Sequence, residues 1–350
     1  MAAVYVYFLI FAQFGFLKAV QATVGESVEV IRPIMAAMGL AGVTGSVFAA
    51  RVFSEQNCRH WLGAGFGACV AASGMVLGVK NSAGLLAVAG LTGLGVGFTT
   101  VTLAGMLRGA VGAAPLGMII GLGTGLAYGF CNLPGVFNAS ATAQAQMALL
   151  AAVAGWVSSR KLTPRFQLEQ SGGGDYSRTG KAAWVVIFAA LVCLDSAAFY
   201  IIQHTTALKE GMWAGPAQLM LNAGAHLGVA VLAGWALDQR WIGLAVGIGV
   251  VALLLACWLV NERHQFLAAA GLLYVAGVSV YSTALVYYPA LSGRPGLAAL
   301  VYAVAGWGGS ALGIGLVVGG RELPVGLSAA AGFIILAGLL TRNIARRRAT

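Results

Sequence analysis

Charged side chains are scarce in this sequence. Lys, Arg, Asp and Glu together make up 9% of its 350 residues, whereas a soluble globular domain carries roughly 25%. Apolar residues make up 59% of the chain, and the mean hydropathy is +0.87. This composition excludes a soluble globular protein and predicts a chain that lies in a lipid bilayer.

Signatures of catalysis and of bound cofactors are also missing. The sequence has no phosphate-binding Walker motif, no His-Glu-x-x-His, no Gly-x-Ser-x-Gly and no Cys-x-x-Cys-His. ATP-driven transport, hydrolase chemistry and haem attachment therefore lack support, and we predict neither an enzyme nor a cofactor. The cysteines form no Cys-x-x-Cys pair, so neither a disulfide framework nor a metal site is indicated. They are Cys58, Cys69, Cys131, Cys193 and Cys257.

Twelve apolar stretches fill most of the chain. Crossing a bilayer takes about 20 mostly apolar residues per helix, so twelve spans need about 240 residues and leave only short loops. The predicted spans are 4–22, 32–52, 61–79, 83–106, 114–136, 141–157, 182–202, 212–237, 241–260, 266–288, 297–319 and 323–340.

The twelve spans form two similar sets of six. Gln13 and Gln21 lie eight residues apart in the first span, and Asp195 and Gln203 lie eight apart in the seventh, at a constant offset of 182 residues. We predict an N-terminal six-helix bundle over 1–157, a cytoplasmic linker over 158–181 and a C-terminal six-helix bundle over 182–350. The Gly-rich run at 171–174 makes this linker a flexible hinge. A duplicated six-helix unit is typical of secondary transporters, which bind their substrate between the halves.

The loops after the second and eighth spans repeat as well, and with the duplication they resemble the major facilitator superfamily. The segment Gly234-Trp-Ala-Leu-Asp238-Gln-Arg240 is similar to that family's Gly-x-x-x-Asp-x-Arg loop motif, and Glu55 and Arg59 stand in a degenerate first copy. The resemblance covers nearly the whole chain. It implies an all-α integral membrane protein with twelve transmembrane helices in two pseudo-symmetric bundles.

The resemblance also implies a gating role for Glu55, Arg59, Asp238 and Arg240. An acid near a helix N-terminus and an arginine form a charge pair that can break and reform. The alternative is a pair of solvated loops that only follow the positive-inside rule. The fourth span departs from the family because the usual arginine before its Gly-rich run is absent, which puts proton coupling in doubt.

In the resembling fold, the first, fourth, seventh and tenth helices line a central cavity. Residues eight apart lie within about 80° on an α-helix, so the first helix of each half carries a polar face. Lipid cannot satisfy those groups, and they should face an aqueous cavity or one another. The candidate substrate-binding residues are Gln13, Lys18, Gln21, Thr99, Asp195, Tyr200, Gln203 and Tyr281.

Asp195 and Lys18 each allow several roles. A buried carboxyl group can carry a proton, so Asp195 is the candidate for proton coupling. It could instead pair with Lys18, bind a cationic substrate, or make a hydrogen bond that only packs helices. Lys18 could bind an anion or extend its amine toward the outer surface.

The distribution of Lys and Arg predicts the orientation. With both termini cytoplasmic, 14 of the 20 lie in inner loops or the C-terminal tail. We predict an integral protein of the bacterial cytoplasmic (inner) membrane, monomeric, with the lipid bilayer and a small-molecule or ion substrate as partners. The basic C-terminal cluster Arg346–Arg348 is interpreted as a lipid anchor, and no nucleic acid partner is expected.

These observations predict a secondary active transporter that moves a small polar or charged solute by rocker-switch alternating access. The alternative is a non-transporting accessory or assembly protein on the same fold, which the degenerate first loop and the missing arginine favour. A third hypothesis is a copper or other metal transporter. Its path of soft ligands would be formed by Met35, Met38, Met212, Met220, Cys193 and His226.

Overall fold

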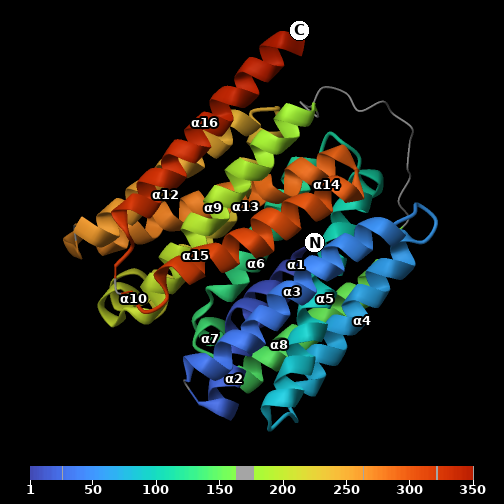
Figure 1. Cartoon of the computed structure of the whole chain (residues 1–350), viewed down its shortest axis with the longest axis vertical. Coiled ribbons are helices and arrows are strands. Elements are labelled where there is room, and N and C mark those ends of the chain that lie inside the picture. Colours follow the sequence, from blue (N-terminus) through green and yellow to red (C-terminus); the bar gives the residue numbers. More distant parts are fainter. Residues whose placement is uncertain (26, 163–176, 263, 321, 350) are drawn as a thin grey trace. The chain divides into compact units, whose positions relative to one another are not determined.

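The computed structural model of the chain consists of helices joined by short loops (Figure 1). It describes residues 1–25, 27–162, 177–262, 264–320 and 322–349. Every regular element in these ranges is helical. Most of the predicted linker, with its Gly-rich run at 171–174, lies outside the described residues, and the side chains of the cluster Arg346–Arg348 are not described either.

The elements before the linker are α1 (Ala2–Tyr7), η1 (Phe8–Gly15), α2 (Phe16–Val24), α3 (Val28–Val52), α4 (Cys58–Met75), α5 (Ser82–Val111), α6 (Leu116–Cys131), α7 (Pro134–Phe137) and α8 (Ala141–Ser159). Those after it are α9 (Arg178–His204), α10 (Thr206–Trp213), α11 (Gly215–Asp238), α12 (Ile242–Glu262), η2 (His264–Phe266), α13 (Leu267–Ser292), α14 (Pro295–Leu300), η3 (Val301–Gly309), α15 (Ser310–Val317) and α16 (Val325–Ala349). The segments η1 and η3 are π-helical turns within continuous helices over Ala2–Val24 and Pro295–Val317.

Each of the twelve predicted spans falls on a helix. Within the described residues, nine helices are long and apolar enough to cross a membrane, and α6 is apolar but shorter. The other two predicted spans coincide with α4 and α8, which are less apolar because α4 carries Arg59 and His60 and α8 carries Gln144 and Gln146. The all-α membrane fold is therefore present, and the count of twelve crossings stays a prediction.

Pro134 ends the fifth predicted span earlier than expected. We predicted a single stretch over 114–136, but α6 ends at Cys131 and the short helix α7 starts at Pro134. Proline has no N–H to donate and pushes the preceding residue out of the helical region. Leu133 accordingly adopts an extended conformation with ψ 134°. Pro134 then fits the first position of α7, where its missing N–H has no cost.

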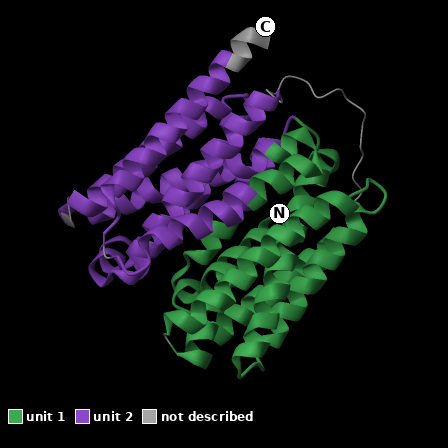
Figure 2. Cartoon of the chain, in the orientation of Figure 1, with its two compact units in different colours: residues 1–113, 126–167, 289–303 green, residues 114–125, 168–288, 304–350 purple. Residues whose placement is uncertain are grey.

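The chain divides into two compact units (Figure 2). Unit 1 comprises residues 1–113, 126–167 and 289–303, and unit 2 comprises residues 114–125, 168–288 and 304–350. The first residues of α6 thus belong to unit 2, and α14 belongs to unit 1. The division into two bundles over 1–157 and 182–350 therefore stays a prediction.

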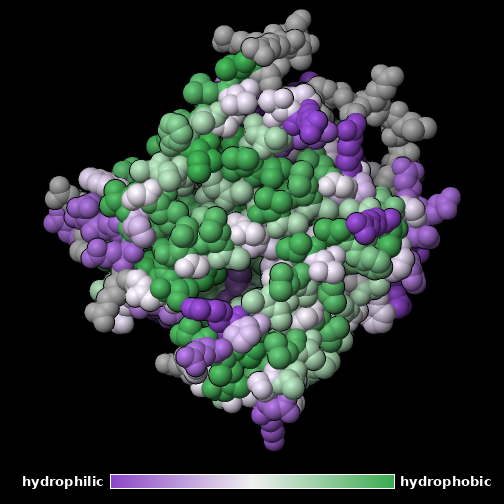
Figure 3. Space-filling model, viewed as in Figure 1, coloured by the Kyte–Doolittle hydropathy of each residue, from purple (hydrophilic) through white to green (hydrophobic). Residues whose placement is uncertain are grey.

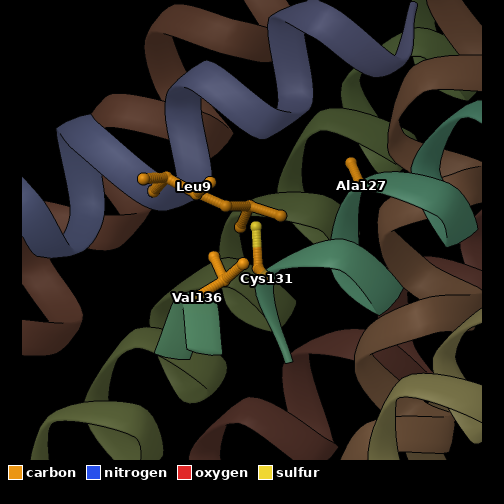
Figure 4. Packing of buried hydrophobic residues seen from close by; sticks show 5 residues of the cluster. Leu9, Ala127, Cys131 and Val136 are labelled. Carbon is orange, nitrogen blue, oxygen red and sulfur yellow. The ribbon is translucent and has the colours of Figure 1, made fainter. Parts of the chain in front are cut away.

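In unit 1, the first helix packs against the end of α6 and against α7. Leu9 of η1 lies with Ala127 and Cys131 of α6 and with Val136 of α7 in a small apolar cluster (Figure 4). Elsewhere in unit 1, α5 packs along both α3 and α4. Lipid tails are as apolar as these side chains, so close packing rather than removal from water holds the helices together.

In unit 2, α6 and α11 approach each other through glycines. A β-carbon placed on Gly121 would run into the carbonyl oxygen of Ala230, and one on Gly234 would run into that of Gly117. Any side chain at these positions would push the two backbones apart. Small residues permit such close approach between membrane helices.

Large apolar side chains cover the outer faces of several helices. On α12 the exposed residues recur every three or four positions along one face, and they are Leu244, Ile248, Val251, Leu255 and Trp258. Hydrophobic residues also cover most of the visible face of both units in Figure 3. A soluble monomer rarely exposes apolar patches of this extent, whereas a membrane protein places them against lipid.

Candidate functional site

Unit 2 contains a carboxylate held by two tyrosines. Asp195 lies on α9, and Tyr274 and Tyr281 lie on α13. The Tyr274 hydroxyl donates to Oδ1 of Asp195 at 2.5 Å, and the Tyr281 hydroxyl donates to Oδ2. Both carboxylate oxygens therefore accept a hydrogen bond from a phenol, as suits an ionised acid away from water.

The two tyrosines belong to a stripe along α13. Tyr274, Tyr281 and Tyr288 recur every seven residues, a spacing that keeps side chains on one face of a helix. The ring of Tyr288 lies 5.5 Å from that of Trp184, which is also on α9. The tyrosine stripe therefore faces α9 over its whole length.

A second polar face of α13 contacts α11 and α6. The hydroxyl of Ser279 is 2.8 Å from Nδ1 of His226 on α11. The hydroxyl of Thr283 is 3.1 Å from that of Thr124 on α6. All four residues are buried. Hydrogen bonds on two faces thus fix the rotation of α13 within unit 2.

The hydrogen bonds of the Asp195 carboxyl group depend on whether it carries a proton. A protonated carboxyl group carries its own O–H donor and loses one acceptor position. One tyrosine hydroxyl would then have to turn from donor to acceptor or move away. We call Asp195, Tyr274 and Tyr281 the Asp195 cluster; its hydrogen bonds join α9 to α13.

Tyr200 and Gln203 do not join this cluster. The ring of Tyr200 stacks on His204 with centroids 4.1 Å apart, and its carbonyl oxygen is 2.8 Å from Nδ1 of that histidine. The side-chain amide nitrogen of Gln203 is buried and has no hydrogen-bond partner among the described residues. A buried donor without a partner costs about 1–3 kcal/mol.

The four candidates in unit 1 have separate surroundings. Gln13 lies in the π-helical turn η1, Lys18 and Gln21 lie in α2, and Thr99 lies in α5. Nζ of Lys18 donates to the carbonyl oxygen of Ala139 at 3.2 Å, beside the loop between α7 and α8.

Gln13 and Gln21 are half-buried, whereas Thr99 is buried. The Thr99 hydroxyl donates to the carbonyl oxygen of Gly95 at 2.6 Å and lies against Gly65 of α4. Thr99 therefore takes part in the packing of α5 on α4.

Of the four predicted gating residues, Asp238 has the most specific contacts. Its Oδ1 accepts from the backbone N–H of Gly117 at 2.6 Å, and its Oδ2 accepts from that of Met118 at 2.9 Å. These N–H groups belong to the first turn of α6, where unsatisfied donors and the helix dipole both favour an anion. Asp238 therefore caps α6 from the end of α11.

Arg240 does not take part in that cap. It is exposed and has a left-handed backbone conformation with φ 64°. In the first loop, Arg59 donates to the carbonyl oxygen of Leu162 at 3.4 Å, and Glu55 is exposed. Within the described residues no ion pair joins Glu55 to Arg59.

The partners of Asp195 and Asp238 were not identified from the sequence. Tyr281 was among the candidate substrate-binding residues, but Tyr274 and the amides of α6 were not. The seven-residue repeat of tyrosines on α13 was the one available signal for the stripe. The stripe faces α9 through hydrogen bonds between residues that are 79 and 86 positions apart in the sequence. Local sequence patterns do not encode such distant contacts.

In the part of the chain that the structure describes, no group of three His, Cys, Asp or Glu side chains lies close enough to hold a metal ion. His226, one of the proposed soft ligands, instead lies against Ser279.

Comparison with known proteins connects the chain to a solved fold. No family model matches the sequence, and no curated protein matches it. Among solved structures, the chain is similar to the crystal structure of the human organic anion transporter MFSD10 (TETRAN), with a TM-score of 0.67 and 12% sequence identity. The match covers 97% of this chain and 96% of the other. At this identity the likeness establishes the fold alone, and that fold agrees with the all-α membrane architecture expected from the sequence.

Proposed function

We propose that this chain, an integral membrane protein with the major-facilitator fold, is a secondary active transporter whose cycle is coupled to protons through Asp195. It moves a small polar or charged solute by alternating access of its two halves. The observation that carries the proposal is the Asp195 cluster, in which an acid on a membrane-spanning helix is held by two phenolic donors. Ionisable residues inside membrane helices usually mark ion or substrate pathways.

The proposed coupling step follows from the hydrogen bonds of the cluster. With Asp195 ionised, Tyr274 and Tyr281 both donate, and α9 is tied to α13. A proton on either oxygen makes the group neutral, so its hydrogen bonds with the tyrosines become weaker or one of them reverses, and the link between α9 and α13 is loosened. A solute that binds the loosened state more tightly than the linked state then drives the conformational change. A ligand shifts the equilibrium between two states only by the difference in its affinity for them.

The cap formed by Asp238 supports a gating role at the end of α11. By the predicted division, α6 belongs to the N-terminal bundle and α11 to the C-terminal one. The bonds from Gly117 and Met118 to Asp238 would then have to break when the halves separate at this end. Their loss exposes the first amides of α6 to water, which can replace the carboxylate.

Small organic anions are the first solute class to test. The similar structure is that of an organic anion transporter.

Proteoliposomes loaded with a pH-sensitive dye test the proposal. Organic anions, amino acids, sugars and organic cations are added in turn, and the internal pH and solute uptake are followed. We expect at least one class to move protons with the wild-type chain, and Asp195→Asn to abolish proton movement while retaining exchange of labelled solute. Ser196→Ala is the matched control, because it removes the neighbouring hydroxyl that donates to Ser310 at 3.0 Å and leaves the cluster intact.

Two results would count against the proposal. If no solute class moves, the accessory-protein alternative is favoured. If a solute moves protons equally well in Asp195→Asn, transport stands and the coupling role of Asp195 is wrong.

A further inference from the structure

A basic surface cavity lies where α11 turns into α12, next to the last part of α16. Its volume is about 260 Å³. It is lined by Arg240, Trp241, Gly243, Leu244, Leu339, Arg342 and Asn343, all of which belong to unit 2. The lining combines two guanidinium groups and a side-chain amide with aliphatic carbon. We propose that this cavity binds a phosphate group, and that in the membrane it takes the phosphate of an anionic phospholipid.

Arg240 occupies a position that usually holds glycine. The N–H of Arg240 donates to the carbonyl oxygen of Leu237 at 2.9 Å, and the N–H of Trp241 donates to that of Ala236 at 3.0 Å. These two bonds form a Schellman motif, whose left-handed residue is normally glycine because a β-carbon is disfavoured there. Strained non-glycine residues of this kind are concentrated at functional sites. The strain at Arg240 places a guanidinium at the rim of the cavity.

Gly243 makes room for the second guanidinium. A β-carbon on Gly243 would collide with Nη1 of Arg342, so the arginine lies directly over the backbone of α12. The guanidinium of Arg342 also lies over the ring of Trp184, 5.0 Å from its centroid. This packing holds the planar donor group in place, which favours recognition of phosphate oxygens by two parallel N–H groups.

The acidic side chains described on α11, on α12 and just before α16 do not line the cavity. Asp238 is near in sequence, but its oxygens accept from Gly117 and Met118. Glu262 lies at the far end of α12, about 30 Å away at 1.5 Å per residue, and Glu322 precedes the far end of α16. Arg240 is exposed, so an anion from outside the chain can reach the guanidinium groups that line the cavity.

The surroundings fit a lipid headgroup. Trp235 and Trp241 are both half-exposed and pack edge to face at 5.4 Å. Tryptophans of this kind gather at the level of the headgroups. The lipid-facing stripe of α12 begins at Leu244, which lines the cavity, and α12 contacts α16 (Figure 1). An acyl chain can follow this stripe while the phosphate stays between the arginines.

Native mass spectrometry of the full chain in detergent tests the site with phosphatidylglycerol and with diacylglycerol, which has the same tails without phosphate. We expect phosphatidylglycerol to be retained and diacylglycerol to be lost. Arg240→Gly should weaken phosphatidylglycerol binding about tenfold or more, since it removes charge-assisted hydrogen bonds. It should not lower the melting temperature, because glycine suits the turn. Arg51→Ala removes an exposed charge at the end of α3 and should leave binding unchanged.

A second variant and a soluble probe complete the test. Gly243→Val fills the space of Arg342 and should also weaken binding. Competition with glycerol 1-phosphate shows whether the phosphate comes from a lipid or from a soluble compound. Displacement of the lipid shows that both bind at the same phosphate site. Binding of glycerol 1-phosphate without lipid binding assigns the site to a soluble phosphoester. Equal retention of diacylglycerol, normal phosphatidylglycerol binding by both variants, or no binding of either phosphate probe would overturn the inference.

Discussion

The tie between Asp195 and Tyr281 should have a measurable free energy that depends on the charge of the acid. Tyr281→Phe removes one donor from an ionised acceptor, and hydrogen bonds to charged groups contribute about 1.5–3 kcal/mol. Tyr7→Phe is a comparison within the same chain, since the buried Tyr7 donates to the neutral carbonyl oxygen of Cys69 at 3.1 Å. A neutral bond contributes about 0.5–1.5 kcal/mol. Tyr281→Phe should therefore cost about 1 kcal/mol more than Tyr7→Phe.

Reversible unfolding in mixed micelles of mild detergent and dodecyl sulfate can measure both costs, and a double-mutant cycle isolates the interaction. In the background of Asp195→Asn the acceptor is neutral, so Tyr281→Phe should cost about 1 kcal/mol or less. The coupling energy between the two substitutions should then be about 1 kcal/mol. Additivity within about 0.5 kcal/mol, or equal costs for Tyr281→Phe and Tyr7→Phe, would refute the reasoning that an ionised Asp195 holds α13.

Two further predictions concern the junction of α6 and α11. Gly234→Leu should prevent recovery of folded protein in fluorescence-detected size-exclusion chromatography, because its β-carbon would meet the carbonyl oxygen of Gly117. Gly224→Ala on the same helix should behave as wild type, since no atom lies within 4 Å of the added carbon; similar yields for both would contradict the close contact. Asp238→Ala should lower the unfolding free energy by about 1 kcal/mol through loss of the cap, and Asp238→Asn by less, because an amide oxygen can still accept. Equal losses in the two Asp238 variants would argue against a capping role.

The fold was largely predictable because bilayer thickness imposes a length on apolar runs. All twelve predicted spans lie on helices, and the errors are at their ends. Pro134 divides the fifth span, and α9 starts at Arg178 rather than 182, because the Ser177 hydroxyl accepts from the N–H of Gly180. Local chemistry of this kind can be recognised in a sequence once the ends of helices are examined for caps and prolines.

The candidate site was predictable only in part, because it depends on which sides of the helices are in contact with each other. Asp195 could be singled out as a rare acid in an apolar run, yet its partners lie on a helix far along the chain. Lys18 could be assigned either to an anion or to the end of its helix. Its bond to the carbonyl oxygen of Ala139 depends on where the loop before α8 folds back. Periodicity gives the face on which a residue lies, and tertiary packing decides what that face meets.

The positions of Asp195 and Asp238 make unit 2 responsive to two independent properties of the solution. Asp238 lies at the end of α11 with part of its surface exposed, and attraction between a carboxylate and a helix terminus is weakened by dissolved ions. Asp195 lies on a membrane-spanning helix with both oxygens bonded to tyrosines, where mobile ions screen very little. We therefore expect ionic strength to act on the contact between α11 and α6, and acidity to act on the contact between α9 and α13. Varying salt at constant pH, and pH at constant salt, separates the contribution of each acid without changing a single residue.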